Sequence, residues 1–126
     1  MISTTIEQGK HLVELGLDTK TADMVWTVAN PDLPMLLAYP IEDCNSWEDK
    51  IPAWSLSALL EVMRKLHAVV TLQVTELSKL SIWLRIKDFG FIWKKDIQTQ
   101  NPMDAVYGGM LWLLEQGLIE KEDNDE

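Results

Sequence analysis

The segment from Asn101 to Gly117 constrains the fold most, because it carries helix signals at both ends. Asn101 can cap a helix, Pro102 suits the first helical position, and Gly117 suits the residue just past the end. Residues 105–114 are apolar nearly all round, which is typical of a helix buried on two sides. The sequence therefore predicts a terminal helix that lies within the core.

Two adjacent glycines stand in the middle of this predicted helix. Gly108 and Gly109 share one stripe with Ala105 and Trp112 at helical spacing. A glycine inside a helix costs about 1 kcal/mol relative to alanine, so a pair indicates that something packs closely against the backbone. That neighbour is either another element of the same chain or a second copy in a twofold dimer. Both close packing and self-association remain open for this stripe.

The other elements are predicted from caps and from side-chain alternation. Either Thr4 with Glu7 or Thr5 with Gln8 can form a capping box for a first helix that ends near Gly16, and Ser55 can cap a second helix. Strands are expected at residues 24–29, 33–39, 68–75, 80–87 and 89–95, with a loop at 40–52. The fold class is therefore α+β, an antiparallel sheet of a hairpin plus a three-stranded meander, with helices packed on one face. Residues 1–119 are expected to form a single domain, and 120–126 an acidic flexible tail.

Charge is distributed unevenly along the chain. Residues 64–95 carry seven bases and two acids, although the whole chain has a net charge of −9. Alternation along strand 80–87 places Trp83, Arg85 and Lys87 on one face, and Trp93 and Lys94 follow on the next strand. Aromatic rings and cations together are what a single-stranded nucleic acid needs, for stacking and for phosphate binding. These residues form the candidate interaction surface.

A structural interpretation of the same residues competes with this one. Sheet faces also use aromatics and long cationic stems to cover apolar neighbours, and the acidity of the chain opposes binding to phosphates. Nucleic acid is therefore a disfavoured partner that the sequence does not exclude.

The sequence offers no set of residues that predicts catalysis. His11 and Glu14 share a helix face but supply only two metal ligands, and Glu42, Asp43 and Cys44 lie in an acidic loop without calcium-loop spacing. Glycine-rich phosphate loops and nucleophile motifs are missing from the sequence. We therefore expect no enzyme activity, no catalytic residue, no metal and no cofactor.

The expected setting is the cytoplasm. The only cysteine excludes an internal disulfide, as is usual in a reducing compartment. No apolar run approaches the roughly 20 residues that span a bilayer, and the first residues lack the pattern of a signal peptide. We expect no contact with a membrane.

The block from Ile51 to Leu56, Ile-Pro-Ala-Trp-Ser-Leu, together with Trp-Leu-Leu-Glu-x-Gly at 112–117, carries a resemblance. It resembles small uncharacterised proteins of gut anaerobic bacteria and of their prophages and mobile elements. The resemblance implies a bacterial or phage cytoplasmic setting and no known activity. We therefore expect a non-enzymatic binding or accessory protein that acts through protein–protein contacts with an unidentified partner, and that forms a homodimer if the glycine stripe is an interface.

Overall fold

The structure of the chain, a computed structural model, describes residues 3–41, 48–65, 68–86 and 90–118. Its helices are α1 (Ile6–Glu14), α2 (Leu56–Arg64) and α3 (Pro102–Glu115), with a 3₁₀ turn η1 (Thr19–Thr21). Its strands are β1 (Met24–Thr27), β2 (Met35–Leu37), β3 (Lys50–Ala53), β4 (Ala68–Val74), β5 (Ser78–Ile86) and β6 (Gly90–Thr99). The strands form two three-stranded antiparallel sheets against which the helices pack, so the predicted α+β class is confirmed.

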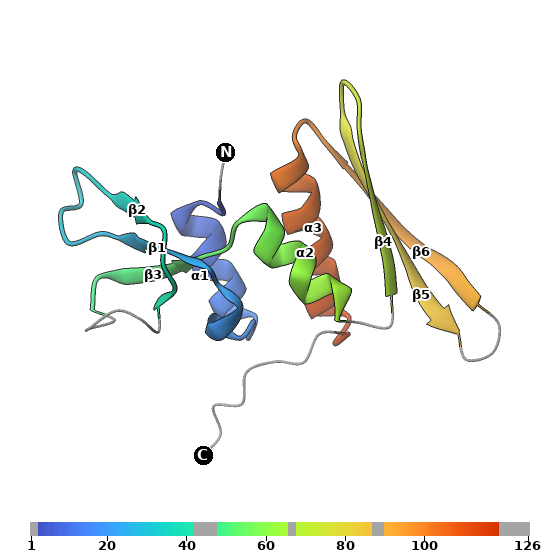
Figure 1. The fold of residues 1–126 in the computed structure, drawn as a ribbon, viewed down its shortest axis with the longest axis horizontal. Coiled ribbons are helices and arrows are strands. Elements are labelled where there is room, and N and C mark those ends of the chain that lie inside the picture. Colours follow the sequence, from blue (N-terminus) through green and yellow to red (C-terminus); the bar gives the residue numbers. More distant parts are fainter. Residues whose placement is uncertain (1–2, 42–47, 66–67, 87–89, 119–126) are drawn as a thin grey trace, which may run out of the picture.

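The two sheets lie at opposite ends of the molecule, with the helices between them (Figure 1). The first sheet has the order β2-β1-β3, and the second has the order β4-β5-β6. The predicted hairpin therefore does not join the predicted meander. It is completed by β3, whose first three residues fall within the segment expected to be a loop. The loop prediction was wrong at residues 50–52 because a four-residue strand that contains Pro52 shows no alternation to detect.

The helix ends follow from the predicted caps. The backbone N–H of Gln8 donates to Thr5 Oγ1 at 3.1 Å, and that of Thr5 donates to Gln8 Oε1 at 2.9 Å. The Ser55 side chain accepts from the Ala58 N–H at 3.1 Å, at the start of α2. Each bond satisfies an N–H that has no partner within the helix, which fixes where α1 and α2 begin.

The cap of α3 involves two bonds with the same partner. Asn101 Oδ1 accepts from the Asp104 N–H, and Asn101 Nδ2 donates to Asp104 Oδ2, both at 2.9 Å. Gly117 follows the helix with φ +70°, a left-handed conformation that glycine adopts without strain.

Helix α3 packs between α2 and the sheet of β4, β5 and β6. A Cβ built on Gly109 would overlap Leu80 Cδ2 and would lie 3.3 Å from Met63 Cε. A Cβ on Gly108 would lie 3.0 Å from Ile97 Cγ2. The close neighbours of both glycines are therefore elements of the same chain. Of the other residues on the stripe, Ala105 is buried and Trp112 is half-buried.

One buried cluster connects the helices to the second sheet. It contains Leu12 of α1, Trp54, Met63 of α2, Leu80 of β5 and residues of α3. The Trp54 indole N–H donates to Thr21 Oγ1 at 2.8 Å, so the buried ring keeps a hydrogen-bond partner.

Thr4 joins segments that are far apart in the sequence. Its backbone N–H donates to the Trp54 carbonyl at 2.9 Å, and its hydroxyl accepts from the Trp54 N–H at 3.1 Å. Its carbonyl accepts from the Trp26 indole at 3.0 Å. This buried residue therefore links the start of the chain to β1 and to the segment that precedes α2.

Candidate interaction surface

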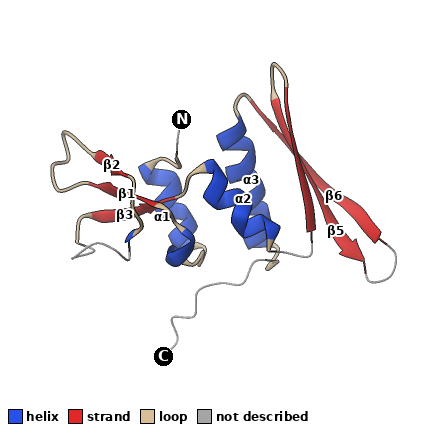
Figure 2. Cartoon of the chain, viewed as in Figure 1, coloured by secondary structure: helices blue, strands red, loops and turns tan. Residues whose placement is uncertain are grey.

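Among the described elements, no helix packs on one face of the second sheet. Leu80 and Ile82 of β5 are buried, and both would touch a Cβ on Gly109 of α3. Because alternate residues of a strand point to opposite faces, Ser81 and Trp83 point away from α3. Figure 2 shows the helices on a single side of this sheet. We call the other side the open face; the strand register gives its residues as Thr71, Gln73, Lys79, Ser81, Trp83, Trp93, Asp96 and Gln98.

The two predicted tryptophans meet on this open face. Trp83 is paired directly with Trp93 across β5 and β6. Ile82 is paired with Lys95, so Lys94 is an extra residue in β6 and forms a β-bulge. The Trp93 side chain is 54% exposed, whereas Trp83 is half-buried. Directly paired residues have Cβ atoms about 4.5–5.5 Å apart, so the two side chains leave the sheet side by side on the same face.

Asp96 fixes the orientation of Trp93. The Trp93 indole N–H donates to Asp96 Oδ1 at 2.9 Å. A hydrogen bond from Ser81, the Trp93 bond and the charge of Lys79 lower the pKa of Asp96 below its ordinary value of 3.8. The carboxylate is therefore charged at neutral pH and holds the indole in place while a ring face stays in solvent.

Sequence patterns alone do not group Asp96 with Trp93. Residues three apart on a regular strand point to opposite faces. The bulge at Lys94 inserts one residue between them, so both pair with residues of β5 that lie on the open face. A bulge leaves no clear mark in the sequence, and this partner was missed for that reason.

The predicted cations are not all on the open face. Lys94 is exposed at the bulge, whereas Lys95 is paired with Ile82 and so belongs to the side that carries the helices. Arg85 is described only as the backbone partner of Phe91, and Lys87 lies outside the described residues. Within the open face as defined, Lys79 and Asp96 carry opposite charges.

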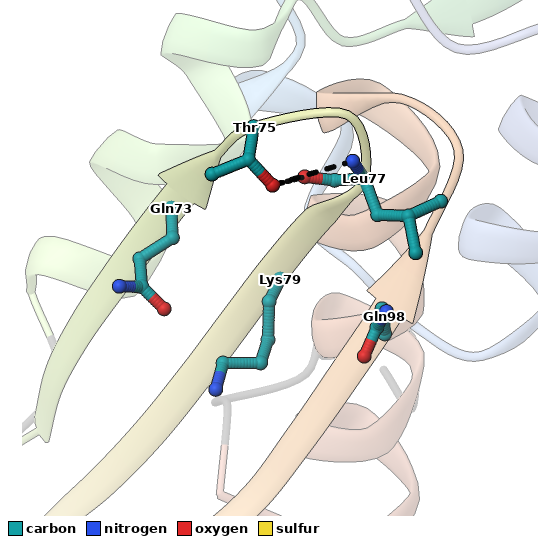
Figure 3. A pocket seen from close by; sticks show the side chains of 5 residues that line it. All are labelled: Gln73, Thr75, Leu77, Lys79 and Gln98. Atoms are coloured by element: carbon teal, nitrogen blue, oxygen red, sulfur yellow. Dashed lines mark hydrogen bonds between the residues drawn. The ribbon is translucent and has the colours of Figure 1, made fainter.

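A hollow lies on the open face beside the β4–β5 turn (Figure 3). It encloses about 220 Å³ and is lined by Gln73, Thr75, Leu77, Lys79 and Gln98. Thr75 closes the turn, since its hydroxyl donates to the Leu77 carbonyl at 3.2 Å. Two side-chain amides and an ammonium group can bind carbonyl or carboxylate oxygens of a partner.

The remaining candidate groups are dispersed. His11 Nδ1 lies 3.7 Å from Glu14 Oε2 on the exposed side of α1. Across the described residues, no group of three or more His, Cys, Asp and Glu side chains is placed to hold a metal ion. Glu42, Asp43 and Cys44 lie outside that part of the chain, as do residues 119–126 of the predicted tail.

The longest helix in the described segments, α3, has 14 residues, and no helix in those segments is long and apolar enough to cross a bilayer.

No protein family model, curated protein or solved structure matches this chain. The candidate site is therefore defined by its own geometry.

Proposed function

We propose that the chain is a non-enzymatic binding protein and that its open face binds a partner protein. The observation that carries this proposal is the exposed Trp93 paired with Trp83 on the open face, on which none of the described helices packs. Tryptophan is among the residues that contribute most to protein–protein binding. Because Asp96 already holds the indole, little side-chain freedom is lost when a partner covers the ring.

The polar groups around the tryptophans support a protein partner. Gln73, Lys79 and Gln98 line the hollow and can bind the carbonyl and carboxylate groups of a polypeptide. Lys79 and Asp96 balance each other, and a low density of net charge is usual in the central part of protein interfaces. The surface thus combines an aromatic anchor with a polar surround.

The proposed setting is the bacterial or phage cytoplasm, with the chain acting as an accessory protein of a mobile element. Two observations support this part of the proposal. The chain has one cysteine, Cys44, which is usual in a reducing compartment. Its Ile51–Leu56 block resembles proteins of prophages and mobile elements.

Site-specific photo-crosslinking in the producing cell tests the proposal. A photoreactive amino acid at Gln98, on the open face, should give a defined protein adduct that Trp93→Ala abolishes. The same amino acid at Lys10, which is exposed on α1, should give no such adduct. Tyr39→Ala removes an aromatic that is also exposed but follows β2 in the other sheet region, and it should leave the Gln98 adduct unchanged. Adducts of equal yield from both positions would reject the open face as the binding surface.

Single-stranded nucleic acid is a second candidate partner. The exposed Lys94, at the bulge next to Trp93, favours it, since stacking and positive charge then lie close together. Fluorescence anisotropy with labelled single-stranded oligonucleotides over a salt series decides between the two candidates. Binding that weakens steeply with salt and is lost in Trp93→Ala would favour nucleic acid. Absence of binding at low salt would leave the protein partner.

A further inference from the structure

The edges of the two sheets differ in how well they are protected against pairing with another chain. Natural sheets protect an edge strand by shortness, proline, charge or a bulge, because its free N–H and C=O groups can bind a further strand. In the first sheet, β2 has three residues and follows Pro34. The other edge, β3, contains Lys50 and Pro52. Both edges of this sheet are protected.

The second sheet has one protected edge and one unprotected edge. On β6, the bulge is accompanied by the exposed charges of Lys94, Lys95 and Asp96. On β4, the sequence Ala-Val-Val-Thr-Leu-Gln-Val contains no charge and no proline. Its register with β5 is regular over all seven residues, and among the described strands β4 pairs with β5 alone.

The hydrogen-bonding groups on the free side of β4 can be assigned from the turn. The Thr75 N–H donates to the Leu77 carbonyl at 2.9 Å, so Thr75 faces β5. In an antiparallel ladder, successive residues bond alternately to one side and the other. Val70, Leu72 and Val74 therefore direct their N–H and C=O groups away from β5. The Val74 side chain is 61% exposed, whereas those of Val70 and Leu72, on the same face of the strand, are half-buried.

We propose that β4 pairs antiparallel with β4 of a second copy of this chain across a twofold axis. Pairing that uses the whole strand places the axis at Thr71 and sets Val70 opposite the partner's Leu72. These residues direct their backbone groups outward, so each such pair exchanges two N–H···O bonds. The two copies then share one continuous sheet, and their open faces lie side by side.

This pairing ends at a dimer. After β4 joins its copy, the outer edges of the shared sheet are the two β6 strands, each with its bulge and charges. The assembly is closed by symmetry rather than open-ended. The proposed interface is distinct from the glycine stripe of α3, and it does not depend on which partner binds the open face.

Sedimentation of the full chain over a concentration series, with charge variants at Thr71, tests the proposed dimer. The Thr71 side chain is exposed, and at the axis it would face the partner's Thr71 in a closely spaced pair. Thr71→Lys and Thr71→Glu should each raise the dimer dissociation constant about fivefold through like-charge repulsion. An equal mixture of the two variants should restore a one-to-one heterodimer. Gln98→Lys, exposed on β6 of the same face, should dimerise like the wild type.

Hydrogen exchange of the unaltered chain gives a readout that needs no variant. The amides of Val70, Leu72 and Val74 should become protected as the concentration rises, whereas those of Thr71 and Gln73, which face β5, should not change. A wild type that stays monomeric at every soluble concentration would overturn the proposal. So would a dimer that neither charge variant weakens, or a ladder of larger species.

Discussion

At the scale of single residues, a hydrogen bond on the open face links protonation to the position of an aromatic ring. The Asp96 carboxylate accepts from the Trp93 indole, and its pKa is lowered mainly by Ser81 and by that indole. A carboxyl group whose pKa is lower in the folded state stabilises the fold above its ordinary pKa. That stabilisation is lost as the pH falls through the lowered value.

We therefore predict how Trp93 responds to acid. The NMR shift of its indole N–H should follow a titration whose midpoint lies below 3.8, the ordinary pKa of an aspartate. Asp96→Asn should remove this transition. A midpoint at or above pH 3.8 would contradict the hydrogen bond to a charged Asp96.

Gly109 provides a second prediction at this scale. Alanine there would gain about 1 kcal/mol of helix propensity but would overlap Leu80 Cδ2, and overpacking a core typically costs about 1–3 kcal/mol. Gly109→Ala should therefore lower the free energy of unfolding in urea. Gly108→Ala should cost less, since its Cβ would lie 3.0 Å from the Ile97 methyl.

A double variant tests whether the overlap with Leu80 causes the stability loss of Gly109→Ala. Leu80→Ala alone should cost about 2–5 kcal/mol because it leaves a cavity. Combined with Gly109→Ala, the loss of unfolding free energy should be smaller than the sum of the two single losses. The reason is that Leu80→Ala frees the space that the new methyl group at position 109 then fills. Additive costs would show that the two residues do not share the space that the structure indicates.

At the scale of elements, the helices were predictable because their ends are marked by side chains. Thr5, Ser55 and Asn101 each bind backbone N–H groups within four residues, and such local chemistry can be read from the sequence. The strands were less predictable. The end of β6 carries Asp96, Gln98 and Thr99, which look like a loop until the open face accounts for polar side chains there.

We predict that the cap of α3 contributes measurably to stability. Asn101→Ala should lower the free energy of unfolding by about 1 kcal/mol, because the Asp104 N–H loses its acceptor. Asn101→Ser should retain most of that stability, since a hydroxyl can accept the same bond. Urea denaturation measures both, and equal losses in the two variants would contradict a capping role.

The candidate site was also predictable in part, from side-chain alternation along β5. Alternation along β5 was enough to place Trp83 opposite the core, and its pairing with Trp93 follows from an ordinary hairpin. Because of the bulge, Lys95 lies on the side of the sheet that carries the helices and Asp96 lies on the open face. Only the three-dimensional register shows these two positions.

At the scale of the whole molecule, the two sheets lie on opposite sides of the helices instead of forming one layer. The sequence could not indicate this, because the partner that completes the first sheet is the short strand β3, about 25 residues after β1. The buried cluster runs without interruption from α1 through α2 and α3 to β5.

That continuity predicts a single cooperative unfolding transition for the whole chain, as expected of one domain. In a urea titration, the fluorescence change of Trp54, which is buried beside η1, should coincide with the fluorescence change of Trp83 on the second sheet. Single-tryptophan variants that report each site by fluorescence make the comparison. Two separated transitions would indicate two domains.

The bonds of Thr4 have a consequence for the order in which the chain assembles on the ribosome. Two of its three long-range hydrogen bonds are to Trp54, so these bonds form only after more than fifty residues have been made. During that interval α1 and the β1–β2 hairpin lack the hydrogen bonds between Thr4 and the Trp54 backbone. Early folding of α1 and of the β1–β2 hairpin should therefore be reversible until Trp54 has been made and the hydrogen bonds to Thr4 have formed.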